Sequence, residues 1–175
     1  HTGLRRSEAL ALRWDDIDLA QLSVSRSLHH LRTGGTVFRA PKTAKGRRMV
    51  ALPPSAVIVL RQHKAAQDAL DKSLGKDFKP GSDLVFCNVD STPILPDTFT
   101  HAWIKTARRA GFQAISLRDA RNTHATLLLK QGVHPKIEQE RLGHATIATT
   151  LDTYTHVLPS LQEAAALRFD DVAQC

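Results

Sequence analysis

Cysteine, aromatic residues and long apolar runs are all scarce in this chain of 175 residues, and each scarcity excludes a class of protein. The two cysteines, Cys87 and Cys175, are too few for the disulfide framework of a small secreted domain, so we expect a reducing, cytoplasmic compartment. No apolar run is long enough for a membrane-spanning helix, and no signal peptide opens the sequence. Aromatic residues make up only 5% of the chain, so aliphatic side chains must fill the core.

The residues that are present favour one folded domain with an anionic partner. Hydrophobic residues make up 42% of the chain, and its length suits one domain better than two. The formal net charge is +7, which indicates an anionic partner. Nucleic acid is the first candidate for this partner and a membrane surface is the second. The sequence begins at His1 and not at a methionine, so we expect a fragment of a longer protein.

The pattern of apolar and turn residues predicts an α+β fold that is mostly α-helical. The segment from Leu22 to Leu52 alternates and has turn signals at residues 34–35 and 45–46, which predicts a small three-stranded antiparallel sheet with two hairpins. Ser7 and Ser116 are predicted helix caps, and the three leucines at 127–129 are assigned to the core. Helices are expected over residues 7–14, 53–74, 95–110, 116–131, 135–142, 146–157 and 159–172.

The stretch from Ser116 to Val157 holds the side chains with the clearest chemistry. It contains Arg118, Arg121, His144 and Tyr154, the last being the only tyrosine in the chain. The planar fork of an arginine fits two oxygens of a phosphate. A phenol has an ordinary pKa of about 10, and nearby positive charge favours the phenolate. The same charge stabilises a pentacovalent phosphorane, so this set predicts a phosphate attacked by a phenol.

Five segments of the chain also resemble, in order, the catalytic domain of the tyrosine recombinases, the phage-integrase family. They read TGLRRSEALALRW, PKTAKGRRMVALP, RNTHATLLLKQGV, LGH and TLDTYTHV. The resemblance covers nearly the whole chain. It implies that residues 1–175 form the catalytic domain of that family, without the N-terminal DNA-binding domains usual there.

The resemblance also implies a role for individual residues. Arg5 and Arg121 match the two family arginines that bind the scissile phosphate, and Glu8 matches the acidic residue that follows the first. His144 matches the histidine of the Leu-Gly-His motif, and Tyr154 matches the nucleophile. The family lysine that protonates the leaving 5′ oxygen falls on Lys42.

One family position has an alternative residue, and at another this chain departs from the family pattern. Lys45 lies in the same turn region as Lys42, and it is the alternative general acid. The family pattern has a histidine three residues before the second arginine, where this chain has Arg118. Making Arg118 the second arginine would break the match of the RNTHATLLL segment. We therefore expect Arg118 to replace that histidine and to offer a fixed donor to a phosphate oxygen.

The resemblance implies a site-specific DNA recombinase or integrase that cleaves and rejoins strands through a 3′-phosphotyrosine. It implies no metal and no other cofactor, and a metal site is also not expected at His29, His30 or His124, which lack ligand spacing. The expected partners are double-stranded DNA with a specific site and further copies of the chain, as a tetramer on DNA, with no membrane. The expected place is the cytoplasm of a bacterial cell, at the nucleoid. The alternatives are a DNA-binding remnant that no longer cleaves and a type IB topoisomerase-like enzyme.

Overall fold

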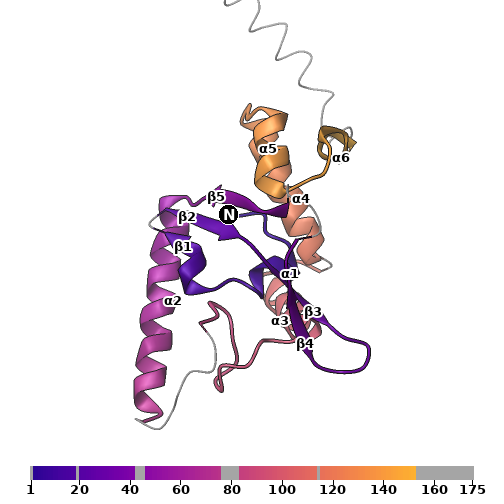
Figure 1. The fold of residues 1–175 in the computed structure, drawn as a ribbon. Coiled ribbons are helices and arrows are strands. Elements are labelled where there is room, and N and C mark those ends of the chain that lie inside the picture. Colours follow the sequence, from indigo (N-terminus) through magenta and orange to yellow (C-terminus); the bar gives the residue numbers. More distant parts are fainter. Residues whose placement is uncertain (1, 19, 42–45, 76–82, 114, 153–175) are drawn as a thin grey trace, which may run out of the picture.

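The computed structural model describes residues 2–18, 20–41, 46–75, 83–113 and 115–152, and all structural statements concern these residues. Figure 1 shows their arrangement. The elements in chain order are α1 (Arg6–Ala9), η1 (Trp14–Asp16), β1 (Ile17–Asp18), β2 (Gln21–Val24), β3 (Ser27–His30), β4 (Thr36–Arg39), β5 (Arg48–Ala51), α2 (Pro54–Ser73), α3 (Pro96–Arg109), α4 (Leu117–Lys130), α5 (Pro135–Leu142) and α6 (Ile147–Asp152).

The predicted three-stranded antiparallel sheet is present, but its strands are not those expected. It has the order β1-β2-β5, with Leu22 opposite Val50. Residues 17–18 form its edge strand. The alternating residues 22–31 form two strands and not one. The chain is divided after β2, where the Ser25 hydroxyl and the Arg26 guanidinium both donate to Asp16. These contacts end one strand before the next begins.

The second half of that divided run forms a hairpin of its own. β3 pairs antiparallel with β4, through the turn predicted at residues 34–35. The second predicted hairpin is wrong in its partner, because β5 pairs with β2 and not with β4. Leu28 of β3 is buried with Leu10 and Ala11, and Phe99 of α3 packs against them. This cluster holds the hairpin against α1 and α3.

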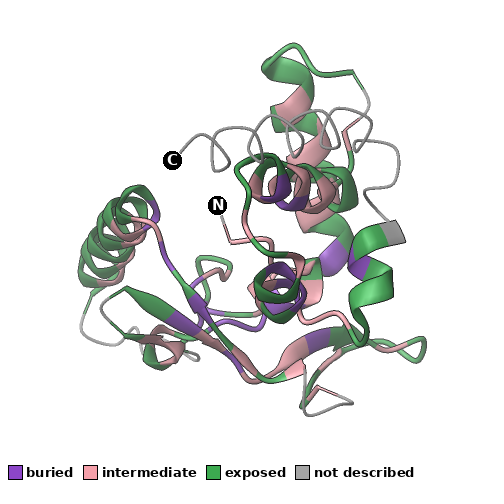
Figure 2. Cartoon of the chain, turned by 90° about the horizontal axis from the view of Figure 1, so that it is seen from above, coloured by how far each residue is buried: buried purple, intermediate pink, exposed green. Residues whose placement is uncertain are grey.

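The main apolar core lies between the three-stranded sheet and α2. It is aliphatic, as the low aromatic content requires, and combines Leu12, Leu22, Val24, Val50, Leu52, Ala56 and Val85. Buried residues follow the strands and the inner sides of the helices, whereas α2 is mostly exposed (Figure 2). No helix within the described ranges is both long and apolar enough to cross a lipid bilayer.

Helices α3, α4 and α5 begin and end close to the predicted residues. α6 also begins close to the predicted residue, and its predicted end at residue 157 lies outside the described residues. Ser116 caps α4, since its hydroxyl accepts from the backbone N–H of Asp119. α5 ends at Gly143, which has the left-handed φ of 65°. Ala125 and Leu129 of α4 pack against Leu142 of α5. The α4–α5 pair therefore fixes the position of the residues that follow Leu142.

Two local predictions are wrong. The first helix starts after Arg5 and not at Ser7, because the Glu8 carboxylate accepts the backbone N–H of Arg5. Of the three leucines assigned to the core, Leu129 is buried, but Leu127 is 55% exposed. Residues 127 and 129 are two apart, about 200° around a helix, so they face opposite sides. The helix predicted at 159–172 lies outside the described residues.

Candidate active site

A pocket of about 540 Å³ lies where α1, α3, α4 and the segment after α5 meet. Arginine, histidine and neutral side chains line it, and the lining contains no aspartate or glutamate among the described residues. The lining residues are Leu4, Arg5, Arg6, Thr100, Ser116, Leu117, Arg118, Arg121, Asn122, His144 and Thr149. The structure thus brings four of the predicted site residues, from segments far apart in the sequence, to one basic pocket.

Arg5 is held in this pocket by Glu8, one turn along α1. Its Nη1 donates to Glu8 Oε1 at 2.7 Å, and its Nη2 donates to the carbonyl of Gly143 at 2.9 Å. Burial alone raises the pKa of the Glu8 carboxyl, but hydrogen bonds and charge from Arg48, with hydrogen bonds from Arg5, lower it below its ordinary value. Glu8 is therefore a carboxylate at neutral pH, and its charge orients Arg5.

Arg121 joins the start of the chain to the end of α5. Its Nη1 donates to the carbonyl of Gly3 at 2.5 Å, and its Nη2 donates to the carbonyl of Leu142 at 2.6 Å. Gly3 has a φ of 65°, and an added Cβ would lie 2.7 Å from Leu142. Only glycine fits this close approach without strain. The Thr-Gly-Leu-Arg segment and Arg121 therefore depend on one another for their positions.

Three successive carbonyl groups at the end of α5 each accept a hydrogen bond from a different arginine. Arg48 Nε donates to Arg141 O at 2.7 Å, and Arg121 and Arg5 bind the next two carbonyls. The last carbonyls of a helix have no partner within the helix, and cations there are favourable. These arginines therefore fix the backbone immediately before His144.

His144 faces the pocket as a neutral imidazole. Its Nδ1 lies 2.9 Å from the hydroxyl of Thr150, which is fully buried in α6. Burial, followed by the charges of Arg121, Arg5 and Arg48, lowers the pKa of His144 to about 4. Among the described residues only Nδ1 has a hydrogen-bond partner, so Nε2 is the ring nitrogen for a ligand.

We expect the His144 ring to titrate with a midpoint of about 4 in the folded chain. Its ordinary value is about 6.5, so the unfolded chain binds the proton first. This contribution to the free energy of unfolding is complete above pH 6.5 and is lost as the pH falls towards 4. NMR titration of the ring measures the midpoint directly. A midpoint near 6.5 would show that neither burial nor the arginines act on the ring.

Arg118 lies at the outer edge of the pocket. It is exposed, and it precedes Arg121 by one helical turn on α4. The two arginines thus differ in setting: Arg121 bonds backbone carbonyls inside the domain, and Arg118 lines the pocket from the solvent side. The pairing of Arg121, not Arg118, with the second family arginine stays a prediction.

Lys42, its alternative Lys45, and Tyr154 lie outside the described residues. Their assignment as general acid and nucleophile stays a prediction. Within the described residues, no group of three or more histidine, cysteine, aspartate or glutamate side chains is arranged to hold a metal ion.

The sequence interpretation missed Arg48, which we read only as part of a strand. Its side chain is 6% exposed and forms an ion pair with Glu8 at 2.8 Å. The sequence contained an indication of this, because Arg48 and the buried Val50 are two residues apart and so face the same side of the strand. A charge on the inward face of a strand requires a buried partner. Which carboxylate supplies that partner was not visible in the sequence.

The family profile and the curated relatives that match this chain agree on one family. The profile described as "Phage integrase family" matches residues 1–160. The chain is 34% identical over 173 residues to the ICEBs1 integrase of Bacillus subtilis (strain 168), covering 98% of this chain and 46% of that protein. It is 31% identical over 185 residues to a tyrosine recombinase XerC-like protein of Caldanaerobacter subterraneus subsp. tengcongensis, covering 98% and 47%. The chain spans about half the length of these curated relatives.

Solved structures share the fold at lower sequence identity. The Tn1549 transposon integrase, in complex with a circular intermediate DNA, superimposes with a TM-score of 0.77 at 21% identity, covering 96% of this chain and 55% of that one. The XerA recombinase superimposes with a TM-score of 0.71 at 23% identity, covering 96% and 54%. At these identities the similarity shows the fold alone.

Proposed function

Because the chain belongs to the phage integrase family, we propose that it is the catalytic part of a site-specific DNA recombinase that works through a 3′-phosphotyrosine. The observation that carries this proposal is the pocket with Arg5, Arg121 and His144 together and no carboxylate in its described lining. Such a pocket suits a phosphodiester, whose charge needs cationic donors on several sides.

The proposed reaction uses each group in one step. Arg5 and Arg121 donate to the non-bridging oxygens of the scissile phosphate. Positive charge near a phenol favours the phenolate. The Tyr154 phenol releases its proton to solvent, and the phenolate attacks phosphorus. The bond to the 5′ oxygen breaks as Lys42 gives that oxygen a proton. Reversal of these steps by another 5′ hydroxyl rejoins the strand.

His144 contributes a hydrogen bond and not a charge. When the Thr150 hydroxyl donates to Nδ1, the single proton of the neutral ring is on Nε2. Nε2 then donates to an oxygen of the phosphate, and its bond strengthens as charge develops there. In the sequence, the proposed nucleophile Tyr154 follows Thr150 by four positions, and Thr150 is the residue that contacts the His144 ring.

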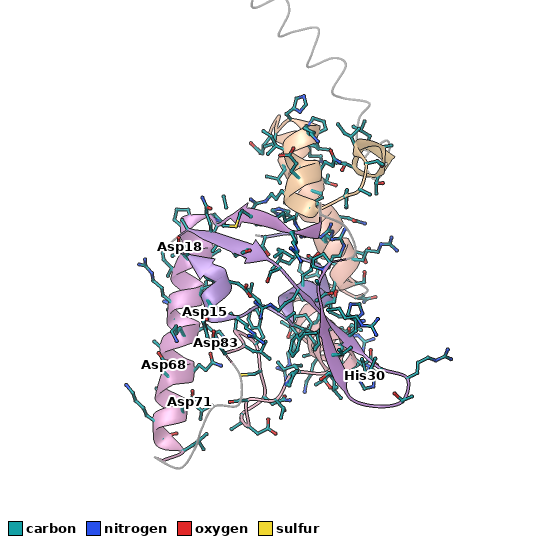
Figure 3. The ribbon with its side chains drawn as sticks, viewed as in Figure 1. Asp15, Asp18, His30, Asp68, Asp71 and Asp83 are labelled. Atoms are coloured by element: carbon teal, nitrogen blue, oxygen red, sulfur yellow. The ribbon has the colours of Figure 1, made fainter. Side chains whose placement is uncertain are left out.

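The distribution of charge suggests which side of the domain faces DNA. Asp15, Asp18, Asp68, Asp71 and Asp83 lie around α2 and β1 (Figure 3). The arginine-lined pocket lies away from them, between α1, α3 and α4. A polyanion is attracted to the arginine-lined pocket. We therefore place double-stranded DNA over the pocket, with α2 on the far side.

Covalent trapping tests the proposal. The 175-residue chain would be incubated, in EDTA, with a pool of nicked duplexes whose central bases are randomised. A nick just 3′ of the cleaved bond lets the short fragment that carries the freed 5′ hydroxyl leave, so the phosphotyrosyl adduct accumulates. We expect an adduct that protease treatment shortens, and sequencing its DNA would identify the site.

Binding without any adduct would favour the remnant, and relaxation of supercoiled DNA lacking that site would favour the topoisomerase. Adducts that form only with magnesium would exclude the metal-free reaction.

A second prediction concerns Arg118. Replacing it with alanine removes one donor from the pocket edge, and the loss of one such donor costs about 3 kcal/mol of transition-state stabilisation. We expect Arg118→Ala to slow adduct formation about a hundredfold while DNA binding persists. Arg118→His restores a donor that titrates near pH 6.5, so it should cleave and gain an acidic limb in its pH–rate profile.

Two results would contradict this view of Arg118. Native-rate cleavage by Arg118→Ala would make Arg118 a surface residue without a part in the reaction. Cleavage by Arg118→His alone, with none by the native chain, would identify the native chain as a binder that has lost its activity.

A further inference from the structure

We infer that Arg48 is a positioning residue of this site, which acts on Arg5 through Glu8 and on His144 through the end of α5; this rests on the proposed function. Arg48 starts β5, and its guanidinium lies between α1 and α5. It is not among the residues that line the arginine-lined pocket, although it lines a neighbouring pocket with Gly143 and His144. Its charge also contributes to the low pKa of His144.

The first connection runs from Arg48 to Arg5 through a shared carboxylate. Arg48 Nη1 and Nη2 donate to Glu8 Oε1 and Oε2 at 3.0 and 2.8 Å. Oε1 also accepts from Arg5 Nη1, and Oε2 also accepts from the backbone N–H of Arg5. Each Glu8 oxygen is thus held from two sides. The bidentate contact with Arg48 fixes the plane of the carboxylate, and that plane fixes where Arg5 points.

The second connection runs from Arg48 to the backbone before His144. Arg48 Nε donates to Arg141 O at 2.7 Å, in the last turn of α5. A Cβ added to Gly143 would lie 2.8 Å from Arg48 Nη1, so the guanidinium packs directly against this glycine. Arg5 in turn donates to the carbonyl of Gly143. Arg48 therefore supports both ends of the same short segment.

Burial makes this arrangement depend on the arginine itself. The Arg48 and Glu8 side chains are 6% and 8% exposed. Removing one partner of a buried ion pair leaves the other charge poorly compensated. Without Arg48, burial raises the pKa of Glu8, and a protonated Glu8 accepts fewer hydrogen bonds from Arg5. Removing Arg48 therefore weakens the hydrogen bonds that hold Arg5, although Arg48 itself does not line the arginine-lined pocket.

The test compares Arg48→Met, Arg48→Lys, Glu8→Gln and the double variant with both Arg48→Met and Glu8→Gln, all in the 175-residue chain. Arg61→Met is the matched control, because it removes one exposed arginine from α2, on the far side of the domain. Measured quantities are the single-turnover rate of adduct formation on the trapped site, DNA affinity, thermal unfolding and the pH–rate profile.

We expect Arg48→Met to slow adduct formation about a hundredfold, since small displacements of catalytic groups have effects of this size. Its DNA affinity should match that of Arg61→Met, because both lose one charge. Its rate should fall further as the pH is lowered, because Glu8 without Arg48 has a higher pKa than in the native chain. Arg48→Lys should recover part of the rate and reduce this acidic limb.

The double variant separates positioning from stability. Replacing both members of a buried pair removes the uncompensated charge, so the double variant should unfold at a higher temperature than Arg48→Met. Its rate should stay as slow as that of the slower single variant, because both substitutions break one connection to Arg5. Two outcomes overturn the inference. One is a double variant that regains the native rate along with its stability. The other is a double variant whose loss of rate equals the product of the losses in the two single variants.

A measurement without DNA keeps this inference separate from the proposed function. The NMR signals of the Arg5 Nε–H group and the His144 ring should shift in Arg48→Met and in Arg48→Lys, and stay unchanged in Arg61→Met. If the native chain forms no adduct, the proposed function fails, and these signals still decide the role of Arg48. Unshifted signals in a folded Arg48→Met chain would exclude a positioning role.

Discussion

Tyr154→Phe is expected to abolish the covalent adduct with DNA while leaving DNA binding and folding nearly unchanged. The substitution removes one oxygen and keeps the ring, so packing changes little and only the nucleophile is lost. Loss of a nucleophile that forms a covalent intermediate lowers rates on the order of 10⁶-fold in a well-studied protease. The adduct should therefore fall below detection on the nicked substrate described above.

The appropriate controls for this result are DNA affinity and thermal unfolding of the Phe variant. Both should agree with those of the native chain, which shows that the loss concerns chemistry and not structure. If the Phe variant still formed an adduct at the native rate, another side chain would be the nucleophile. Peptide mapping of the native adduct would then locate that residue.

Arg121→Lys is expected to reduce the rate of adduct formation about a thousandfold, although the charge is kept. Arg121 reaches Gly3 O and Leu142 O with two separate nitrogens of one planar group. An ammonium is a single point donor and cannot span both carbonyls while it also faces a phosphate. The variant therefore loses a transition-state donor, worth about 10²- to 10³-fold, together with a support for the backbone before His144.

Arg118→Lys is the matched comparison on the same helix. Arg118 is exposed and lines only the edge of the pocket, so a lysine there still offers one donor and one charge. We expect a loss of about tenfold or less, because only the fork geometry changes. A larger effect at 118 than at 121 would reverse the assignment of the two arginines. Thermal unfolding of both variants would show how much of each loss is due to stability.

Local signals in the sequence determined most of the helices. A serine with an acidic residue three positions later begins α4, and a glycine with a left-handed φ ends α5. Both features act within a few residues of one another, so the amino acids alone specify them. The residue types of the site were visible for the same kind of reason, since arginine, histidine and a single tyrosine carry their chemistry wherever the fold places them.

Contacts between distant segments were decided only by the tertiary structure. β2 and β5 both alternate, but nothing in either strand says that they pair with each other and not with the β3–β4 hairpin. Arg48 and Glu8 are 40 residues apart, and Arg121 and Gly3 are 118 apart. Such pairs form because a buried charge or carbonyl must find a partner, and packing of the whole domain determines which partner is within reach.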